Sequence, residues 1–143
     1  MPATTAVIDP NVLISALIRR DGGNPASVVR SIDTGVLVPI LSPILVTQLD
    51  EAAARPKFRR YFSLVDAWTL RGLLEAQGQW HADPPAGPRL TRDPNDDYLV
   101  RLYRSSGAEW LLSGDRDLLE AQLSDVEALS PQQAVVKLMN RWT

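Results

Sequence analysis

The sequence predicts one α/β domain, a three-layer sandwich with helices on both faces of a mainly parallel central sheet. Short apolar runs alternate along the whole chain with segments whose apolar residues recur at helical spacing. The chain has 143 residues, a typical length for one domain, and 45% of its side chains are hydrophobic. It contains no internal repeat, low-complexity tract or linker. We therefore expect residues 1–143 to form a single domain with right-handed crossovers between its strands.

Four apolar runs are expected to be strands, the last at an edge of the sheet: 5–8, 36–40, 109–112 and 126–129. Helical segments, with the capping residues that the sequence identifies, are 11–18, 24–35, 42–54, 63–77, 93–107, 117–123 and 130–142. Four of these helices are expected to begin with a capping residue followed by proline, whose missing N–H is not needed in the first turn. These caps are Asn24, Ser42, Asp93 and Ser130. Trp68 and Trp110 fall on apolar stretches and are expected in the core.

Composition excludes several classes of protein. The chain lacks cysteine, so disulfides, a thiolate nucleophile and a cysteine zinc site are excluded. We expect a cytoplasmic protein without a membrane span, because there is no signal-like start and no apolar run of roughly 20 residues. A net charge of −2 argues against a protein that coats nucleic acid through bulk positive charge. His81 is the one histidine, which excludes a metal-free ribonuclease that uses two histidines in one chain.

Acidic residues gather where the predicted strands end. Asp9 and Asp115 come directly after two strands, and a third group of acids opens the helix that begins near residue 93. In parallel α/β sheets, ligands bind beyond the carboxyl ends of the strands. Several carboxylates in one crevice repel each other unless a cation neutralises them, and oxygen ligands favour hard ions such as Mg²⁺ or Mn²⁺. Such ions activate water for attack on a phosphodiester.

Each acidic residue also has a purely structural interpretation. Asp93 stands at a helix start, where Asp96 and Asp97 would complement the helix dipole. Asp115 and Asp117 are placed to cap the short helix after them. Asp9 favours a functional role, because Asn11 offers an alternative cap for the first helix.

Several motifs, taken in order, resemble those of the PIN (PilT N-terminus) domain family. The chain opens with an apolar strand followed by an Asp-x-Asn motif and a helical serine, at residues 7–15. The later block combines residues 93–99 with 107–119, and the resemblance extends to 42–58 and 129–131. Each motif is weakly specific alone, but the ordered combination covers nearly the whole chain. Within this family, the chain resembles VapC-like toxin components of bacterial toxin–antitoxin pairs.

The resemblance implies a Mg²⁺- or Mn²⁺-dependent ribonuclease with three acidic ligands: Asp9, Asp96 and Asp115. The implied supporting polar residues are Asn11, Ser15, Gln48, Glu51, Asp93, Asp97, Ser113 and Asp117. Gln48 stands where the family usually has glutamate, and Glu51, one turn along the same face, is a substitute, whereas Asp50 points elsewhere. Candidate RNA contacts are Arg55, Lys57, Arg59, Arg60 and Arg116. The family further implies a small antitoxin partner and a homodimer.

Two other functions stay open at this stage. A haloacid-dehalogenase-like phosphatase also has an aspartate after its first strand, but it needs a second aspartate where this chain has Asn11. A PIN module that only binds RNA or a protein is the other alternative, and Gln48 is the residue that favours it.

Overall fold

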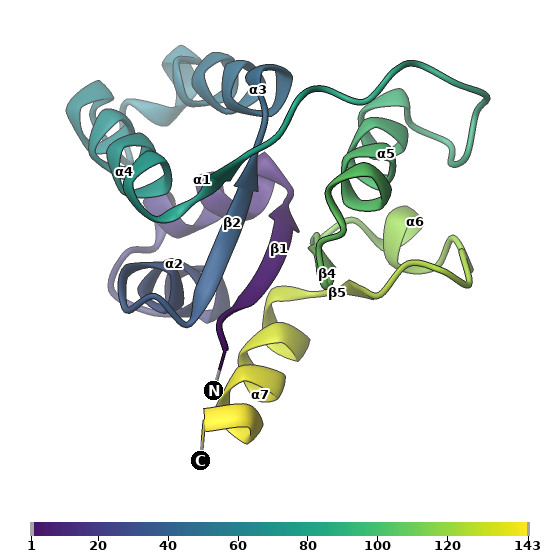
Figure 1. Ribbon diagram of the computed structural model, residues 1–143. Coiled ribbons are helices and arrows are strands. Elements are labelled where there is room, and N and C mark those ends of the chain that lie inside the picture. Colours follow the sequence, from purple (N-terminus) through teal and green to yellow (C-terminus); the bar gives the residue numbers. More distant parts are fainter. Residues whose placement is uncertain (1, 143) are drawn as a thin grey trace.

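In the computed structural model, which describes residues 2–142, five parallel strands form one sheet with the order β3-β2-β1-β4-β5. The strands are β1 (Thr4–Ile8), β2 (Leu37–Leu41), β3 (Gln79–Trp80), β4 (Trp110–Leu112) and β5 (Ala128–Leu129). The helices are α1 (Pro10–Ile18), α2 (Asn24–Asp33), α3 (Pro43–Ala53), α4 (Leu64–Gln77), α5 (Pro94–Ser106), α6 (Arg116–Leu119) and α7 (Pro131–Trp142), with a 3₁₀ turn η1 (Pro56–Phe58). Figure 1 shows α1 to α4 on one side of the sheet and α5 with α6 on the other. The predicted α/β sandwich is confirmed.

The alternation of side chains along each strand builds two separate cores. In β1, Ala6 and Ile8 join the core beneath α1 to α4 and α7, whereas Val7 joins the core beneath α5 and α6. In β4, Leu111 faces the same way as Val7, while its two neighbours face the other core. Both faces of a strand are therefore apolar, which is why the strands appear in the sequence as continuous hydrophobic runs.

Capping residues set most of the helix boundaries. Ser42 accepts a hydrogen bond from the Leu45 N–H at the start of α3, and Ser63 forms a reciprocal capping box with Asp66 at the start of α4. α5 ends at Gly107, whose φ of 71° lies in the left-handed region that favours glycine. These predicted boundaries agree with the structure to within about one residue.

Several predicted details were wrong. Gly23, not Asn24, precedes the first helical residue of α2. α6 covers only residues 116–119, so the predicted helix at 117–123 is mostly loop. The edge strand β3 was not predicted. Trp110 is fully buried as expected, but Trp68 is 63% exposed, because the buried face of α4 is narrow and consists of Ala67, Leu70 and Leu74.

No helix within residues 2–142 is long and apolar enough to span a membrane.

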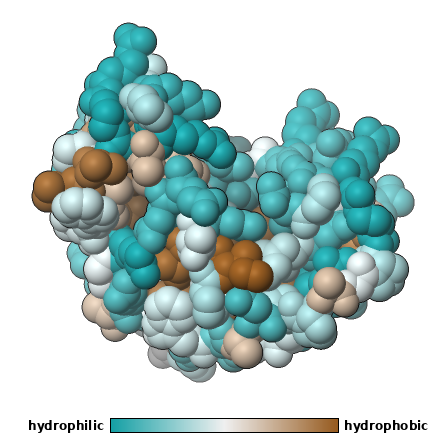
Figure 2. Space-filling model, turned by 90° about the horizontal axis from the view of Figure 1, so that it is seen from above, coloured by the Kyte–Doolittle hydropathy of each residue, from teal (hydrophilic) through white to brown (hydrophobic). Residues whose placement is uncertain are grey.

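The order of the strands determines where a ligand can bind at the edge of the sheet. The chain leaves β1 toward β2 and β3, and later returns to the opposite side of β1 to form β4. The carboxyl ends of β1 and β4 are thus neighbours at the point where the strand order reverses, which is the usual ligand position in open parallel sheets. Seen from above these ends (Figure 2), the surface is largely hydrophilic and hollowed between two raised parts.

Candidate metal centre

Three aspartates cap three helices that begin at this edge of the sheet. Asp9, Asp93 and Asp115 precede α1, α5 and α6, and each accepts a hydrogen bond of 2.9 Å from the backbone N–H two residues later. Asp9 therefore caps its own helix, and the expectation that Asn11 would do so was wrong. The structural and functional interpretations are compatible, because one carboxylate oxygen makes the cap and the other is free for different partners.

Ser113 connects two of these aspartates. Its hydroxyl donates to Oδ2 of Asp9 at 2.9 Å and accepts a hydrogen bond of 3.0 Å from the backbone N–H of Asp115. Ser113 is completely buried at the end of β4, so its position is fixed by the sheet. The predicted supporting role of Ser113 thus corresponds to a link that holds the loops after β1 and β4 together.

Asp96 completes the group from the first turn of α5. Carboxylate oxygens of Asp93, Asp96 and Asp115 lie within 4.8 Å of one another. Asp96 is only 4% exposed, and its Oδ2 has no hydrogen-bond partner among the described residues. An unpartnered buried carboxylate oxygen is costly unless it is protonated or bound to a cation. This oxygen and the oxygen-only donor set fit a hard divalent ion.

The pKa values of these aspartates also favour a bound cation. Burial, followed by the neighbouring charge of Asp115, raises the pKa of Asp96 to about 7. Burial also raises the pKa of Asp9, although hydrogen bonds from Asn11 and Ser113 partly offset it. Without a cation, simultaneous ionisation of all these aspartates is therefore unfavourable in the folded protein. A divalent ion would relieve this repulsion.

A cavity of about 350 Å³ contains the carboxylates. Its polar or charged lining residues are Asp9, Asn11, Gln48, Glu51, Arg55, Asp93, Asn95, Asp96 and Asp115. Gln48 and Glu51 thus share the face of α3 that was expected to reach the site. Asp50 faces away and forms an ion pair with Arg71. Five carboxylates and one guanidinium leave this cavity strongly acidic.

A second cavity, of about 380 Å³, adjoins the first and shares Asp9, Asn11 and Asp115 with it. Ser15 lines this second cavity, while its hydroxyl donates to the backbone carbonyl of Asn11 at 2.9 Å. Of the two predicted supporting residues of α1, Asn11 therefore lines both cavities, whereas Ser15 lines only the second. Together the two cavities form a hydrophilic depression around Asp9 and Asp115.

Other predicted site residues lie elsewhere. Asp97 is 1% exposed and accepts hydrogen bonds from Thr91 and Arg89. Burial would raise its pKa, but those bonds outweigh burial and lower it. Asp97 therefore anchors the loop before α5 and does not line the cavity. Asp117 and Arg116 are exposed and outside the cavity lining, and Arg116 pairs with Glu120.

Asp93 belongs to the cluster of candidate metal ligands, although the sequence predicted it only as a supporting polar residue. The Asp93-Pro94 pair identified a helix cap, but the sequence did not show that Asp93, the cap of α5, would lie close to Asp115, the cap of α6.

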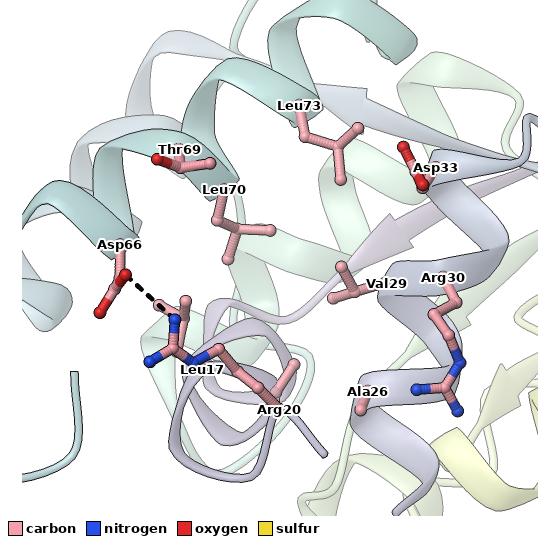
Figure 3. A pocket seen from close by; sticks show the side chains of 11 residues that line it. Leu17, Arg20, Ala26, Val29, Arg30, Asp33, Asp66, Thr69, Leu70 and Leu73 are labelled. Carbon is pink, nitrogen blue, oxygen red and sulfur yellow. Dashed lines mark ion pairs between the residues drawn. The ribbon is translucent and has the colours of Figure 1, made fainter. Parts of the chain in front are cut away.

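A separate cavity of about 430 Å³ lies between α1, α2 and α4. Figure 3 shows its apolar side chains, among them Leu17, Val29 and Leu70, beside the ion pair of Arg20 and Asp66. It shares no lining residue with the acidic cavity.

An acidic centre at the switch point of a five-stranded parallel sheet is suited to bind a hard divalent ion. A family model described as the PIN domain matches residues 5–117, and the chain belongs to this family of nucleases. The chain is also similar to the crystal structure of PAE2754 from Pyrobaculum aerophilum, with a TM-score of 0.62 and 15% identity over 96% of this chain and 90% of that one. At this identity the similarity shows the fold alone. A comparison with curated proteins finds no match.

Proposed function

We propose that this protein is a divalent-metal-dependent endoribonuclease that hydrolyses phosphodiester bonds of RNA in the cytoplasm. The observation that carries the proposal is the triad of Asp93, Asp96 and Asp115, each of which offers an oxygen within 4.8 Å of the others. In addition, the buried Oδ2 of Asp96 has no hydrogen-bond partner among the described residues. Membership of the PIN family supports phosphodiester chemistry. The haloacid-dehalogenase alternative is not supported by the family match, and Asn11 stands where that chemistry needs an acid.

Mg²⁺ or Mn²⁺ is the proposed cofactor, with Asp9, Asp93, Asp96 and Asp115 as the residues that would hold it. A bound divalent ion would supply a water of lowered pKa and would stabilise negative charge on the phosphate. The chain's own contribution is to fix the carboxylates. The caps of α1 and α5 and the hydroxyl of Ser113 restrain these side chains before any ligand binds. Arg55, the one cation among the described residues that line the cavity, is placed to attract the substrate phosphate.

The decisive experiment is cleavage of a fluorophore–quencher RNA with Mg²⁺, with Mn²⁺ and with excess EDTA. We expect cleavage only with metal. Asp9→Asn should abolish it, and Asp21→Asn, which removes a charge from an exposed loop residue outside the cavity, is the matched control. Cleavage that persists in EDTA, or equal activity of the two variants, would refute the proposal.

We further propose that the chain is a toxin that acts beside a small antitoxin and forms a homodimer. The support is its PIN domain and its length, which resemble those of VapC-like toxins. Induced expression should arrest bacterial growth, and Asp115→Asn should remove the arrest if RNA cleavage causes it. Light scattering of the purified protein tests the dimer.

The second candidate is a PIN module that binds RNA without cleaving it. Gln48 favours it, because this neutral side chain lines the acidic cavity. Metal-dependent RNA binding without product formation would identify this function.

A further inference from the structure

The segment after α3 combines positive charge with aromatic rings. Residues 55–61 have the sequence Arg-Pro-Lys-Phe-Arg-Arg-Tyr, with four cations and no acid, in a chain whose net charge is −2. Arg55, Lys57 and Arg60 form no ion pair with any residue between 2 and 142. Their charges are therefore available to an anionic ligand.

Arg59 differs from its neighbours. Its guanidinium donates to the backbone carbonyl of Ala53 and lies 5.2 Å from the ring centre of Phe62. Phe62 is only 3% exposed, and it stacks on Phe58 with 5.6 Å between ring centres. Arg59 and the two phenylalanines thus fix this segment against the body of the protein, and contact of Arg59 with RNA stays a prediction.

The remaining side chains enclose a shallow hollow of about 510 Å³. Its lining residues are Ile18, Lys57, Phe58, Arg60 and Tyr61. Tyr61 is 48% exposed, Lys57 lies 5.1 Å from the ring centre of Phe58, and Arg60 lies 5.3 Å from that of Tyr61. Exposed aromatic rings flanked by cations are what single-stranded nucleic acids require, because their bases stack on rings while their phosphates contact positive charge.

The hollow is connected to the acidic cavity by two elements. Arg55, which lines the acidic cavity, is two residues from Lys57. Helix α1 contributes Pro10 to the cavity and Ile18 to the hollow, and these residues are about 12 Å apart at 1.5 Å per helical residue. This is the length of about three to four stacked nucleotides at 3.4 Å each. A single strand whose scissile phosphate lies in the cavity can therefore reach the hollow.

We propose that the hollow is a subsite for a nucleotide of a single-stranded nucleic acid, about three to four nucleotides from the scissile phosphodiester. Tyr61 stacks on a base of that strand, and Lys57 and Arg60 contact its phosphates. The subsite rests on the proposed nuclease function. A single strand is the ligand that fits it, because the bases of a duplex are already paired and stacked and do not offer a free face to Tyr61.

The test measures binding separately from cleavage. Fluorescein-labelled 12-residue single-stranded RNA, single-stranded DNA and duplex RNA are each titrated with Asp115→Asn protein, whose cleavage should be at least about tenfold slower than that of wild type. Anisotropy is recorded at several salt concentrations. We expect Tyr61→Ala to weaken binding of a single strand by about 5-fold to 100-fold. Tyr61→Trp should restore it. Lys57→Ala and Arg60→Ala should each reduce the salt dependence, by about 0.7 in the slope of log K against log salt.

Trp68→Ala and Arg30→Ala are the controls, since they remove an exposed aromatic ring and an exposed cation outside the hollow. The RNA and DNA arms identify which single strand the subsite accepts. Equal affinities for Tyr61→Ala and Trp68→Ala with both single strands, or an equal loss with duplex, would overturn the subsite. Wild-type cleavage with unchanged Tyr61→Ala binding refutes only the subsite, whereas Tyr61-dependent binding without any wild-type cleavage refutes only the nuclease.

Discussion

Gln48 offers the sharpest test of how the acidic cavity binds metal. It lines the cavity together with Glu51 and four aspartates, and it is the position where the family resemblance implies a glutamate. Gln48→Glu adds a sixth carboxylate to a cavity whose closest carboxylate oxygens lie within 4.8 Å of one another. At a separation of about 5 Å, the new carboxylate and one existing carboxylate would repel by about 1 to 3 kcal/mol, depending on solvent screening. The metal-free variant should be less stable by roughly this amount, and the metal-bound variant should recover it.

The same substitution should tighten Mg²⁺ or Mn²⁺ binding by roughly tenfold or more, which corresponds to about 1.4 kcal/mol. Isothermal calorimetry of wild-type and variant protein with Mn²⁺ measures this directly, and thermal unfolding with and without metal measures the repulsion. Thr47→Glu is the matched control, because it adds the same charge to the same helix on an exposed residue outside the cavity.

Glu51→Gln completes the comparison. If Glu51 supplies the charge that Gln48 lacks, its removal should weaken Mn²⁺ binding by about tenfold and reduce RNA cleavage. Equal metal affinity of wild type, Gln48→Glu and Glu51→Gln would refute the assignment of this face of α3 to the metal.

Three further variants test separate parts of the structure. Asp115→Asn should cut metal-dependent cleavage at least about tenfold while the protein stays folded, because asparagine is also a good helix cap, and circular dichroism beside the cleavage assay shows whether it does. Asp97→Asn should lower the free energy of unfolding by about 2 to 3 kcal/mol in urea, since the buried side chain loses its ion pair with Arg89. Gly78→Ala should cost about 2 kcal/mol or more, because an added Cβ would lie 2.6 Å from the Leu74 carbonyl oxygen, and a thermal melt that matches wild type would contradict this contact.

Local patterns predicted the parts of the fold that depend on local chemistry. The apolar run before Asp9, the cap of α3 and the left-handed Gly107 each act within a few residues, so the sequence alone placed them within about one residue. β3 could not be predicted in this way. Its two exposed residues are a strand only because they pair with β2, after Gly78 packs closely against Leu74 and Pro39.

The difference between local patterns and contacts across the fold also explains which parts of the site could be predicted. Order along the chain placed Asp9 and Asp115 at neighbouring strand ends, and helical spacing placed Gln48 and Glu51 on one face. Which of the acids at the start of α5 enter the cavity depends on the loop before it. Asp97 is turned away by hydrogen bonds to Thr91, which itself binds the backbone of Asp93. No local pattern in the sequence reveals those contacts.

The raised pKa of Asp96 makes the stability of the metal-free protein depend on pH. The folded pKa of about 7 exceeds the ordinary value of 3.8, so between these values the folded protein holds a proton that the unfolded chain has released. The contribution of Asp96 to stability is therefore fully present below about pH 4 and is lost as the pH rises through about 7. The full difference is worth about 4 kcal/mol, and water in the open cavity reduces it to about 2 to 4 kcal/mol.

Urea unfolding in EDTA at pH 5 and pH 8 should show this loss, and the raised pKa of Asp9 acts in the same direction. Saturating Mn²⁺ should remove most of the loss at pH 8, because the ion neutralises the charge that the protein otherwise resists. Asp96→Asn should flatten the pH dependence in EDTA and abolish the recovery with Mn²⁺. A wild-type protein that is more stable at pH 8 than at pH 5 in EDTA would mean that Asp96 is already ionised and stabilised without metal, and the case for a cation at this oxygen would lose its basis.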